Sequence, residues 1–263
     1  LWARGVPSAG EQIARAITVD ANGDVFIGFE LSEQMNIDGI GLSADIDDIA
    51  VVKLGGSNAT RVWAVSFGDD KAQRVSSIAT DGAGAVYFAG HYEGGFPELT
   101  LPVVAAIDGV DGFVASLDPT ATATWSVGFH GPDKQTIEAI AASFSKLWAV
   151  GTFASELHAT GAAILTTTAP ATGFVAVIGF DGKIEQLVAF PGESTVRDVA
   201  IRAGGGAYVA GEFKGTLLLG KDIVTAKSDW DWFLAELDGD GQPVWGLAVG
   251  NAFANIAPQV ASG

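Results

Sequence analysis

Asp20, Asn22 and Asp24 place oxygen-bearing side chains at alternate positions of one short segment. Calcium-binding loops space carboxylate and amide ligands in this way, because hard cations prefer oxygen donors. A complete calcium loop also needs a carboxylate further along the chain, and Glu30 matches that position only loosely. We therefore predict a candidate Ca²⁺ site at Asp20, Asn22 and Asp24, with a tight hairpin turn as the alternative.

Trp230 and Trp232 flank Asp231, which makes a second group of residues that could do chemistry. Exposed tryptophans beside an acid suit stacking on a sugar or on a protein partner. The alternative is burial of both rings against a neighbouring part of the chain. Together with His91, which follows a strand-like run, these three residues are the candidate ligand- or partner-binding residues.

No catalytic residue can be assigned from sequence motifs. The chain has no cysteine, which excludes disulfides, thiol catalysis and zinc–thiolate sites. Its three histidines, His91, His130 and His158, fall at three different positions of the repeat described below, so a shared metal site is not expected. Nucleophile-elbow and phosphate-loop motifs are absent. A carboxylate pair for glycoside hydrolysis could be assembled in space, but 31 acidic residues are too many for the sequence to select two.

The overall charge of the chain argues against two classes of binding partner. The 31 acidic and 14 basic residues give a formal net charge of -17. Such a chain repels nucleic acid and anionic membrane surfaces. No apolar run approaches the roughly 18 residues of a membrane helix, so we expect no transmembrane segment.

The candidate residues are positioned by four copies of one sequence repeat. Short runs ending in glycine recur at steps of 62, 61 and 60 residues, at Gly28, Gly90, Gly151 and Gly211. Tryptophans recur at Trp2, Trp63, Trp125 and Trp245, with Gln186 in the remaining slot. Each run is rich in β-branched and aromatic residues and is bounded by Gly, Asp or Asn, which predicts strands joined by hairpin turns.

The repeat predicts an all-β fold, a β-propeller of four-stranded antiparallel blades within a single domain, 1–263. The four repeats cover about 61 residues each, at 7–67, 68–129, 130–190 and 191–249. An extra strand is expected at each end, at 1–6 and 253–261. Because a closed four-bladed ring has no place for both extra strands, we expect a portion of a larger ring, or pairing of these strands with another chain.

The run from Ala207 to Thr216, followed by Asp231 to Asp238 and Gly241 to Trp245, resembles the bacterial β-propeller repeats often called SBBP repeats. These are common in secreted and surface lipoproteins of myxobacteria and related bacteria. The resemblance covers essentially the whole chain and implies an exported bacterial propeller at the cell surface, in the periplasm or outside the cell. It implies no shared activity and no catalytic residues.

Three functions remain in view. The leading hypothesis is a non-enzymatic binding or structural propeller that acts as a protein-interaction scaffold or in a surface assembly. The first alternative is a carbohydrate-binding, lectin-like propeller with a glycan ligand. The second is a propeller hydrolase or lyase, which would need titratable groups that converge in space. Apart from Ca²⁺, no cofactor is expected.

Overall fold

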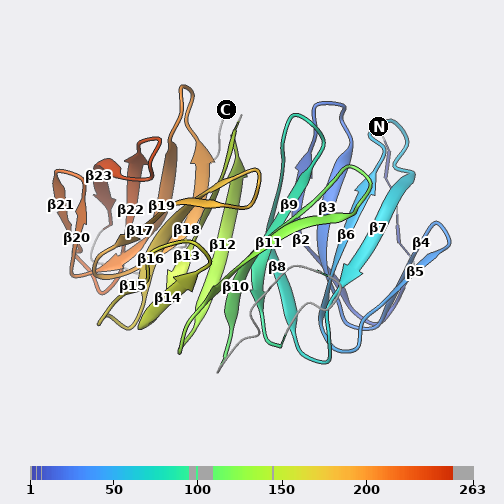
Figure 1. Ribbon diagram of the computed structural model, residues 1–263, viewed down its shortest axis with the longest axis horizontal. Helices are drawn as coiled ribbons and strands as arrows, with labels where there is room; N and C mark the ends of the chain where they lie inside the picture. The colour runs from blue at the N-terminus through green and yellow to red at the C-terminus, as the bar shows by residue number, and fades with distance from the viewer. Residues whose placement is uncertain are drawn as a thin grey trace. The chain divides into compact units, whose positions relative to one another are not determined.

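The computed structural model describes residues 2–3, 5–6, 8–94, 99, 109–143 and 145–250, which form an all-β structure of antiparallel strands (Figure 1). The chain divides into two compact units. Unit 1 comprises Leu1–Ala106 and Val110–Gly128, and unit 2 comprises Ile107–Gly109 and Phe129–Gly263. The search of the described residues for a helix long and apolar enough to cross a membrane found none. The all-β class predicted from the sequence is confirmed.

Unit 1 is built on two antiparallel sheets, in each of which four strands pair in chain order. The first sheet consists of β2 (Gln12–Val19), β3 (Val25–Leu31), β6 (Asp48–Leu54) and β7 (Arg61–Phe67). The second sheet contains β8 (Gln73–Thr80), β9 (Val86–Tyr92), β10 (Asp111–Leu117) and β11 (Ala123–His130). The last two residues of β11 belong to unit 2, where they pair with β14 (Glu156–Ala159), so that this sheet has six strands with β15 (Leu165–Thr166). A smaller sheet contains β1 (Ser8–Ala9), β4 (Gln34–Ile37) and β5 (Ile40–Ser43).

Unit 2 repeats this plan. The third sheet consists of β12 (Gln135–Ala142), β13 (Lys146–Phe153), β16 (Thr172–Gly179) and β17 (Ile184–Phe190). The fourth sheet consists of β18 (Glu193–Ile201), β19 (Ala207–Lys214), β22 (Asp231–Leu237) and β23 (Pro243–Val249). Two short ribbons lie between second and third strands, formed by β14 (Glu156–Ala159) with β15 (Leu165–Thr166), and by β20 (Thr216–Leu219) with β21 (Asp222–Thr225).

Within each unit the later sheet packs on the earlier one through its first strand. In unit 1, β8 contacts β2, β3 and β6, and in unit 2, β18 contacts β12, β13 and β16. Aromatic side chains fill both cores, with the rings of Phe88 and Phe113 5.7 Å apart and those of Phe213 and Phe233 6.3 Å apart, each pair edge-to-face. Burial of these rings supplies most of the driving force for stacking the sheets.

Four hairpin turns of the main sheets are closed by an aspartate that precedes the turn. Asp20 Oδ1 accepts hydrogen bonds from the backbone N–H groups of Asn22 and Asp24, both at 2.9 Å. Gly23 completes this turn with a φ of 82°, which glycine adopts without strain. The same pair of amide contacts, two and four residues on, recurs at Asp81, Asp118 and Asp238.

The strand register corrects one detail of the predicted repeat. Val75, Ile137 and Val196 lie opposite Gly90, Gly151 and Gly211, whereas their counterpart Ala14 lies opposite Phe29 rather than Gly28. The glycine marker is therefore one residue out of phase in the first repeat.

The two predicted terminal strands have different outcomes. Residues 2–3 and 5–6 of the first one are not in a strand, and β1 comes after them and pairs with β4. The second, at 253–261, lies outside the described residues.

Candidate functional site

The first strand of every main sheet carries one β-bulge at the same place in the repeat. At each bulge one residue has no cross-strand partner, because two residues of the first strand face one residue of the second. The unpaired residues are Arg15, Ser76, Glu138 and Arg197. All four are polar, although the strands around them are mainly apolar. Each bulge therefore places one polar side chain per repeat outside the regular alternation of side chains between the two faces of the sheet.

A second polar position lies beside each bulge on the next strand. The register places Glu30, His91, Thr152 and Glu212 at equivalent positions, opposite Ile13, Arg74, Thr136 and Thr195. In the first sheet Arg15 donates to Glu30 across 2.7 Å, and in the fourth sheet Arg197 lies 3.4 Å from Glu212. The residue at the bulge and the polar residue beside it on the next strand thus make a pair of polar positions that recurs in each sheet.

In unit 2 these positions from two sheets meet in one cleft. Arg197 from β18 lies 3.6 Å from the carboxylate of Glu138 on β12 and 3.4 Å from that of Glu212 on β19. The Glu138 carboxylate also accepts a hydrogen bond from the Thr136 hydroxyl at 2.8 Å. The cavity beside them has a volume of about 220 Å³, and its polar lining comes from Lys134, Thr136, Glu138, Thr152, Thr195 and Arg197.

Several polar atoms of this lining are buried without a protein partner. Within the described part of the chain, the hydroxyls of Thr152 and Thr195 and the Nε–H of Arg197 make no hydrogen bond. Thr195 is only 9% exposed, so bulk water solvates it poorly. A buried polar group without a partner costs about 1–3 kcal/mol. These three groups therefore favour a bound molecule that supplies oxygen atoms.

Lys134 sets the charge preference of the cleft. Among the residues that the structure describes, no carboxylate lies within ion-pair distance of its ammonium group. Arg197 is already paired with the carboxylates of Glu138 and Glu212, so the Lys134 ammonium is the cation of the lining that is left to meet a ligand. The cleft therefore offers an ammonium group, hydroxyls and an N–H donor beside two carboxylates, which suits a hydroxylated ligand that can also present a carboxylate to Lys134.

The candidate residues Trp230, Asp231 and Trp232 lie outside the lining of this cleft. Asp231 is 1% exposed and accepts hydrogen bonds from the Lys227 N–H at 2.7 Å and from the Ser228 hydroxyl. These bonds, led by that of Lys227, hold the pKa of the Asp231 carboxyl below its usual value. Asp231 thus holds a loop in place, while Trp230 and Trp232 are half-buried beside it.

His91 occupies the repeat position of Glu30 and Glu212, opposite Arg74 in the second sheet. It is half-buried. The prediction that His91 contacts a ligand thus coincides with the repeated polar position, although His91 is not among the residues of the cleft in unit 2.

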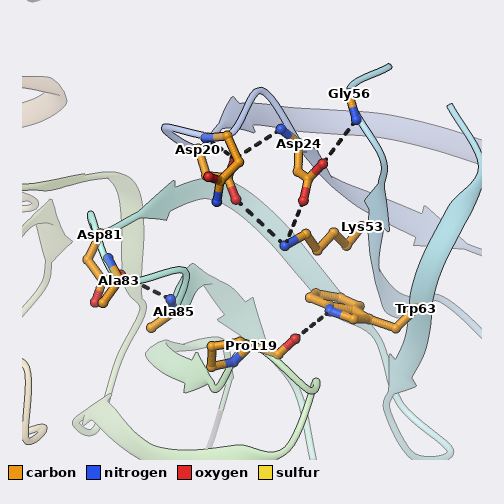
Figure 2. A network of polar contacts seen from close by, with 10 residues as sticks. Asp20, Asp24, Lys53, Gly56, Trp63, Asp81, Ala83, Ala85 and Pro119 are labelled. Carbon is orange, nitrogen blue, oxygen red and sulfur yellow. Dashed lines mark hydrogen bonds and ion pairs between the residues drawn. The ribbon is translucent and has the colours of Figure 1, made fainter. Parts of the chain in front are cut away.

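The predicted calcium ligands face a lysine (Figure 2). The ammonium of Lys53 lies 3.6 Å from Asp20 Oδ2 and 3.0 Å from Asp24 Oδ2. Asp24 also accepts a hydrogen bond from the Gly56 N–H at 3.0 Å, and this bond, with Lys53, lowers the pKa of its carboxyl. Among the described residues no cluster of three or more acidic, histidine or cysteine side chains could hold a metal ion. A calcium ion at this turn would have to compete with Lys53.

Two histidines that the sequence separates meet in the structure. His130 and His158 pair across β11 and β14, and their rings stack with centroids 5.6 Å apart. His158 Nε2 lies 2.9 Å from the Glu156 carboxylate. The two histidines meet because β14, in the ribbon after β13, pairs with the end of β11.

Sequence reasoning missed Glu138, Thr195 and Arg197, the centre of the cleft. A partial signal was present in two of the four first strands, where Arg15 precedes Ala16 and Ile17, and Glu138 precedes Ala139 and Ile140. A bulge cannot be predicted from the alternation of apolar and polar residues alone, however, because it interrupts that alternation.

Neither a protein-family model nor a curated protein sequence matches the chain. Similar solved structures include a quinohemoprotein alcohol dehydrogenase from Comamonas testosteroni, with a TM-score of 0.38 and 10% identity over 91% of this chain and 61% of that chain. Another is the quinohemoprotein alcohol dehydrogenase ADHIIG from Pseudomonas putida HK5, with a TM-score of 0.34 and 10% identity over 91% of this chain and 63% of that chain. This chain thus spans less than two thirds of the length of either protein.

These comparisons correct one prediction. Both similar structures are enzymes, which contradicts the hypothesis of a non-enzymatic protein-interaction scaffold. We therefore withdraw the scaffold hypothesis and consider the two alternatives, a carbohydrate-binding protein and a hydrolase or lyase, against the cleft in unit 2.

Proposed function

We propose that the chain is a portion of a β-propeller and that its cleft in unit 2 binds a small sugar that carries a carboxylate. The propeller part rests on the four sheets, each of which pairs four strands in chain order and fits one predicted repeat to within one residue. Such a sheet cannot bury both faces alone, and radial stacking of four-stranded sheets is the usual solution.

The observation that carries the ligand class is the group of unpartnered donors around Arg197. The ligand carboxylate would face Lys134 and the Arg197 Nε–H, and its ring hydroxyls would bond Thr152, Thr195 and the Glu138 carboxylate. Arginine and carboxylate side chains together can both donate to and accept from sugar hydroxyls. A cavity of about 220 Å³ is small, which favours one sugar ring over a longer oligosaccharide.

Isothermal titration of the chain with D-glucuronate, D-glucose and acetate tests this proposal. We expect glucuronate to bind, and glucose and acetate to bind at least about tenfold more weakly, because each lacks one of the two groups recognised. Equal affinity for acetate and glucuronate would contradict a sugar site, and no binding of glucuronate would contradict the proposal as a whole.

The matched variants are Arg197→Lys and Arg15→Lys. Lysine keeps the charge but removes the planar fork and the Nε–H donor. We expect Arg197→Lys to weaken glucuronate binding about tenfold, the effect of roughly 1.4 kcal/mol. Arg15→Lys changes the equivalent bulge of unit 1, which is outside the cleft, and should leave the affinity unchanged.

A hydrolase or lyase is the second candidate function, favoured by the two carboxylates that flank Arg197. A carboxylate beside a bound sugar can move a proton in glycoside cleavage. If this function holds, the chain should release product from a uronic-acid disaccharide, and Glu138→Gln should abolish release while glucuronate still binds. Product release that survives in Glu138→Gln would contradict a catalytic role for this residue.

A further inference from the structure

The two stacked histidines of unit 2 lie directly opposite each other on two antiparallel strands. His130, at the end of β11, pairs with His158 of β14. Residues opposite each other in such a pair have Cβ atoms about 4.5–5.5 Å apart, so both side chains leave the sheet on the same side. Phe129 and Ala159, the next pair in the register, are 0% and 7% exposed, whereas both histidines are half-buried. The imidazoles are therefore on the more accessible face of this strand pair.

The spacing of the two rings is close to that of two imidazoles that share one metal ion. The ring centroids of His130 and His158 lie 5.6 Å apart. An imidazole nitrogen binds a zinc ion at about 2.0–2.1 Å, so two imidazoles on one tetrahedral ion place their ring centres roughly 5 Å apart. A small rotation of the two side chains therefore suffices to bring one nitrogen of each ring to a shared ion.

Glu156 determines which nitrogen of His158 can bind an ion. Its carboxylate lies 2.9 Å from His158 Nε2, and because an ionised carboxylate only accepts hydrogen bonds, Nε2 carries a proton. In the neutral ring the lone pair is then on Nδ1. Metal-binding histidines almost always donate their other N–H to a carboxylate, a carbonyl or water, which orients the ring and raises the basicity of the ligating nitrogen. The contact between Glu156 and His158 thus has the form of the outer part of a metal site.

The backbone around Glu156 is held by two contacts with the segment that follows β11. Gln135 Nε2 donates to the Glu156 carbonyl at 3.0 Å, and Gln135 is fully buried. A Cβ at Gly131, the residue after His130, would clash with the same carbonyl, so only glycine lets the chain pass this close to β14. The two histidines and Glu156 are therefore carried by a fixed frame, as a metal site requires.

We infer that His130 and His158 bind a divalent first-row transition-metal ion such as Zn²⁺ or Cu²⁺, with water completing the coordination and Glu156 positioning His158. Neutral imidazole is a good ligand for these ions, and the net charge of -17 concentrates cations around the chain. The site has two protein ligands, in agreement with the absence of a cluster of three among the described residues. The ion joins β14 to the end of β11, and none of the three residues lines the cleft that binds the proposed sugar.

Isothermal titration of the untagged 263-residue chain with ZnCl₂ and with CuCl₂ tests this inference. The chain has three histidines and no cysteine, so few other strong ligands compete. We expect one ion per chain, with Cu²⁺ bound more tightly than Zn²⁺. His130→Gln and His158→Gln should each weaken Zn²⁺ binding at least about tenfold. The matched control is His91→Gln, which changes the histidine of unit 1 and should leave the affinity unchanged.

Two further measurements separate loss of a ligand from loss of the fold. Zn²⁺ should raise the melting temperature of the wild type but not that of His158→Gln, because an ion that binds only the folded state stabilises it. The melting temperatures without metal show whether each variant folds. Electron paramagnetic resonance of the wild type loaded with Cu²⁺ should show coupling to two nitrogens, and His130→Gln should show coupling to one.

Glu156→Gln tests the positioning role of the carboxylate. We expect the affinity for Zn²⁺ to fall about 10–100-fold while the Cu²⁺ spectrum still shows two nitrogens, since the ligands remain and only their support is lost. An unchanged affinity would overturn the role of Glu156. The inference as a whole would be overturned by a wild type that binds neither ion, by a wild-type spectrum without nitrogen coupling, or by equal binding to the wild type and both folded histidine variants.

Discussion

Lys53 is the residue on which the charges of the first hairpin turn depend. It is 9% exposed, and its single positive charge faces the carboxylates of both Asp20 and Asp24. Removing one partner of a buried ion pair leaves an uncompensated charge and costs about 3–5 kcal/mol. The turn therefore owes its stability to a side chain from β6, far from it in the sequence.

We expect Lys53→Met to lower the free energy of unfolding by about 3 kcal/mol at neutral pH. Urea denaturation measures this loss. The control is Lys183→Met, which removes an exposed ion pair with Asp181 and should change stability by less than about 0.5 kcal/mol. An equally small loss for both variants would contradict the role of Lys53.

The pKa of Asp24 gives this site a pH dependence. Because folding lowers that pKa below the ordinary value of 3.8, ionised Asp24 stabilises the fold above that pH, and the contribution is lost as the pH falls through the lowered value. The melting temperatures of the wild type and of Asp24→Asn should therefore differ at pH 7 and converge on acidification. A constant difference would show that the carboxylate charge is not involved.

The role of a single residue can be predicted from the sequence when its contacts are with residues close to it in the chain. The turn role of Asp20, the stated alternative to calcium, was readable because the turn is local in sequence. The role of Lys53 could not be predicted in this way, because its contact with the turn depends on the pairing of β3 with β6. The cleft residues Glu138 and Arg197 come from different repeats, and no sequence spacing indicates that their side chains meet.

At the scale of elements, the stacking of β18 on the third sheet depends on glycine. A Cβ at Gly173 would meet Val196 Cγ2 at 2.7 Å and the Val196 backbone nitrogen at 3.1 Å. The Gly173 N–H also donates to the Ser194 hydroxyl on β18 at 3.1 Å, which ties the two sheets together at this contact. The absence of a side chain at Gly173 therefore sets the distance between the two sheets.

Gly173→Ala should destabilise the chain by about 1–3 kcal/mol through overpacking. The double variant with Val196→Ala should lose less than the sum of the two single variants, since the second substitution makes room for the first. Gly239→Ala is the matched control, because nothing lies within 4 Å of its added Cβ. Chemical denaturation of the four variants gives the comparison, and strict additivity would contradict the proposed contact.

The elements themselves were largely predictable. Strand existence and order can be deduced from β-branched and aromatic runs between turn residues, and four sheets in chain order match them. The error of one residue at Gly28 has a physical cause. The first repeat carries Phe29 where the other three carry glycine, so the sequence marker and the structural position separate there.

At the scale of the whole molecule, each unit has a core of its own. Every hydrophobic cluster found among the described residues draws its members from one unit. Composition and repeat length could predict the all-β class, because both are properties that can be counted along the sequence without knowledge of contacts in space. They could not predict which side chains from distant parts of the chain meet, since that depends on how the strands pair in space.

The single unpaired residue at each bulge also bears on how such a chain changes over generations. The residue there has no register partner on the next strand, so replacing its side chain leaves the strand register undisturbed. Arg15, Ser76, Glu138 and Arg197 show that one backbone accommodates cationic, neutral and anionic choices at this place. After duplication of an ancestral repeat, one codon per copy would suffice to give each copy its own chemistry, while the remaining copies preserve the original.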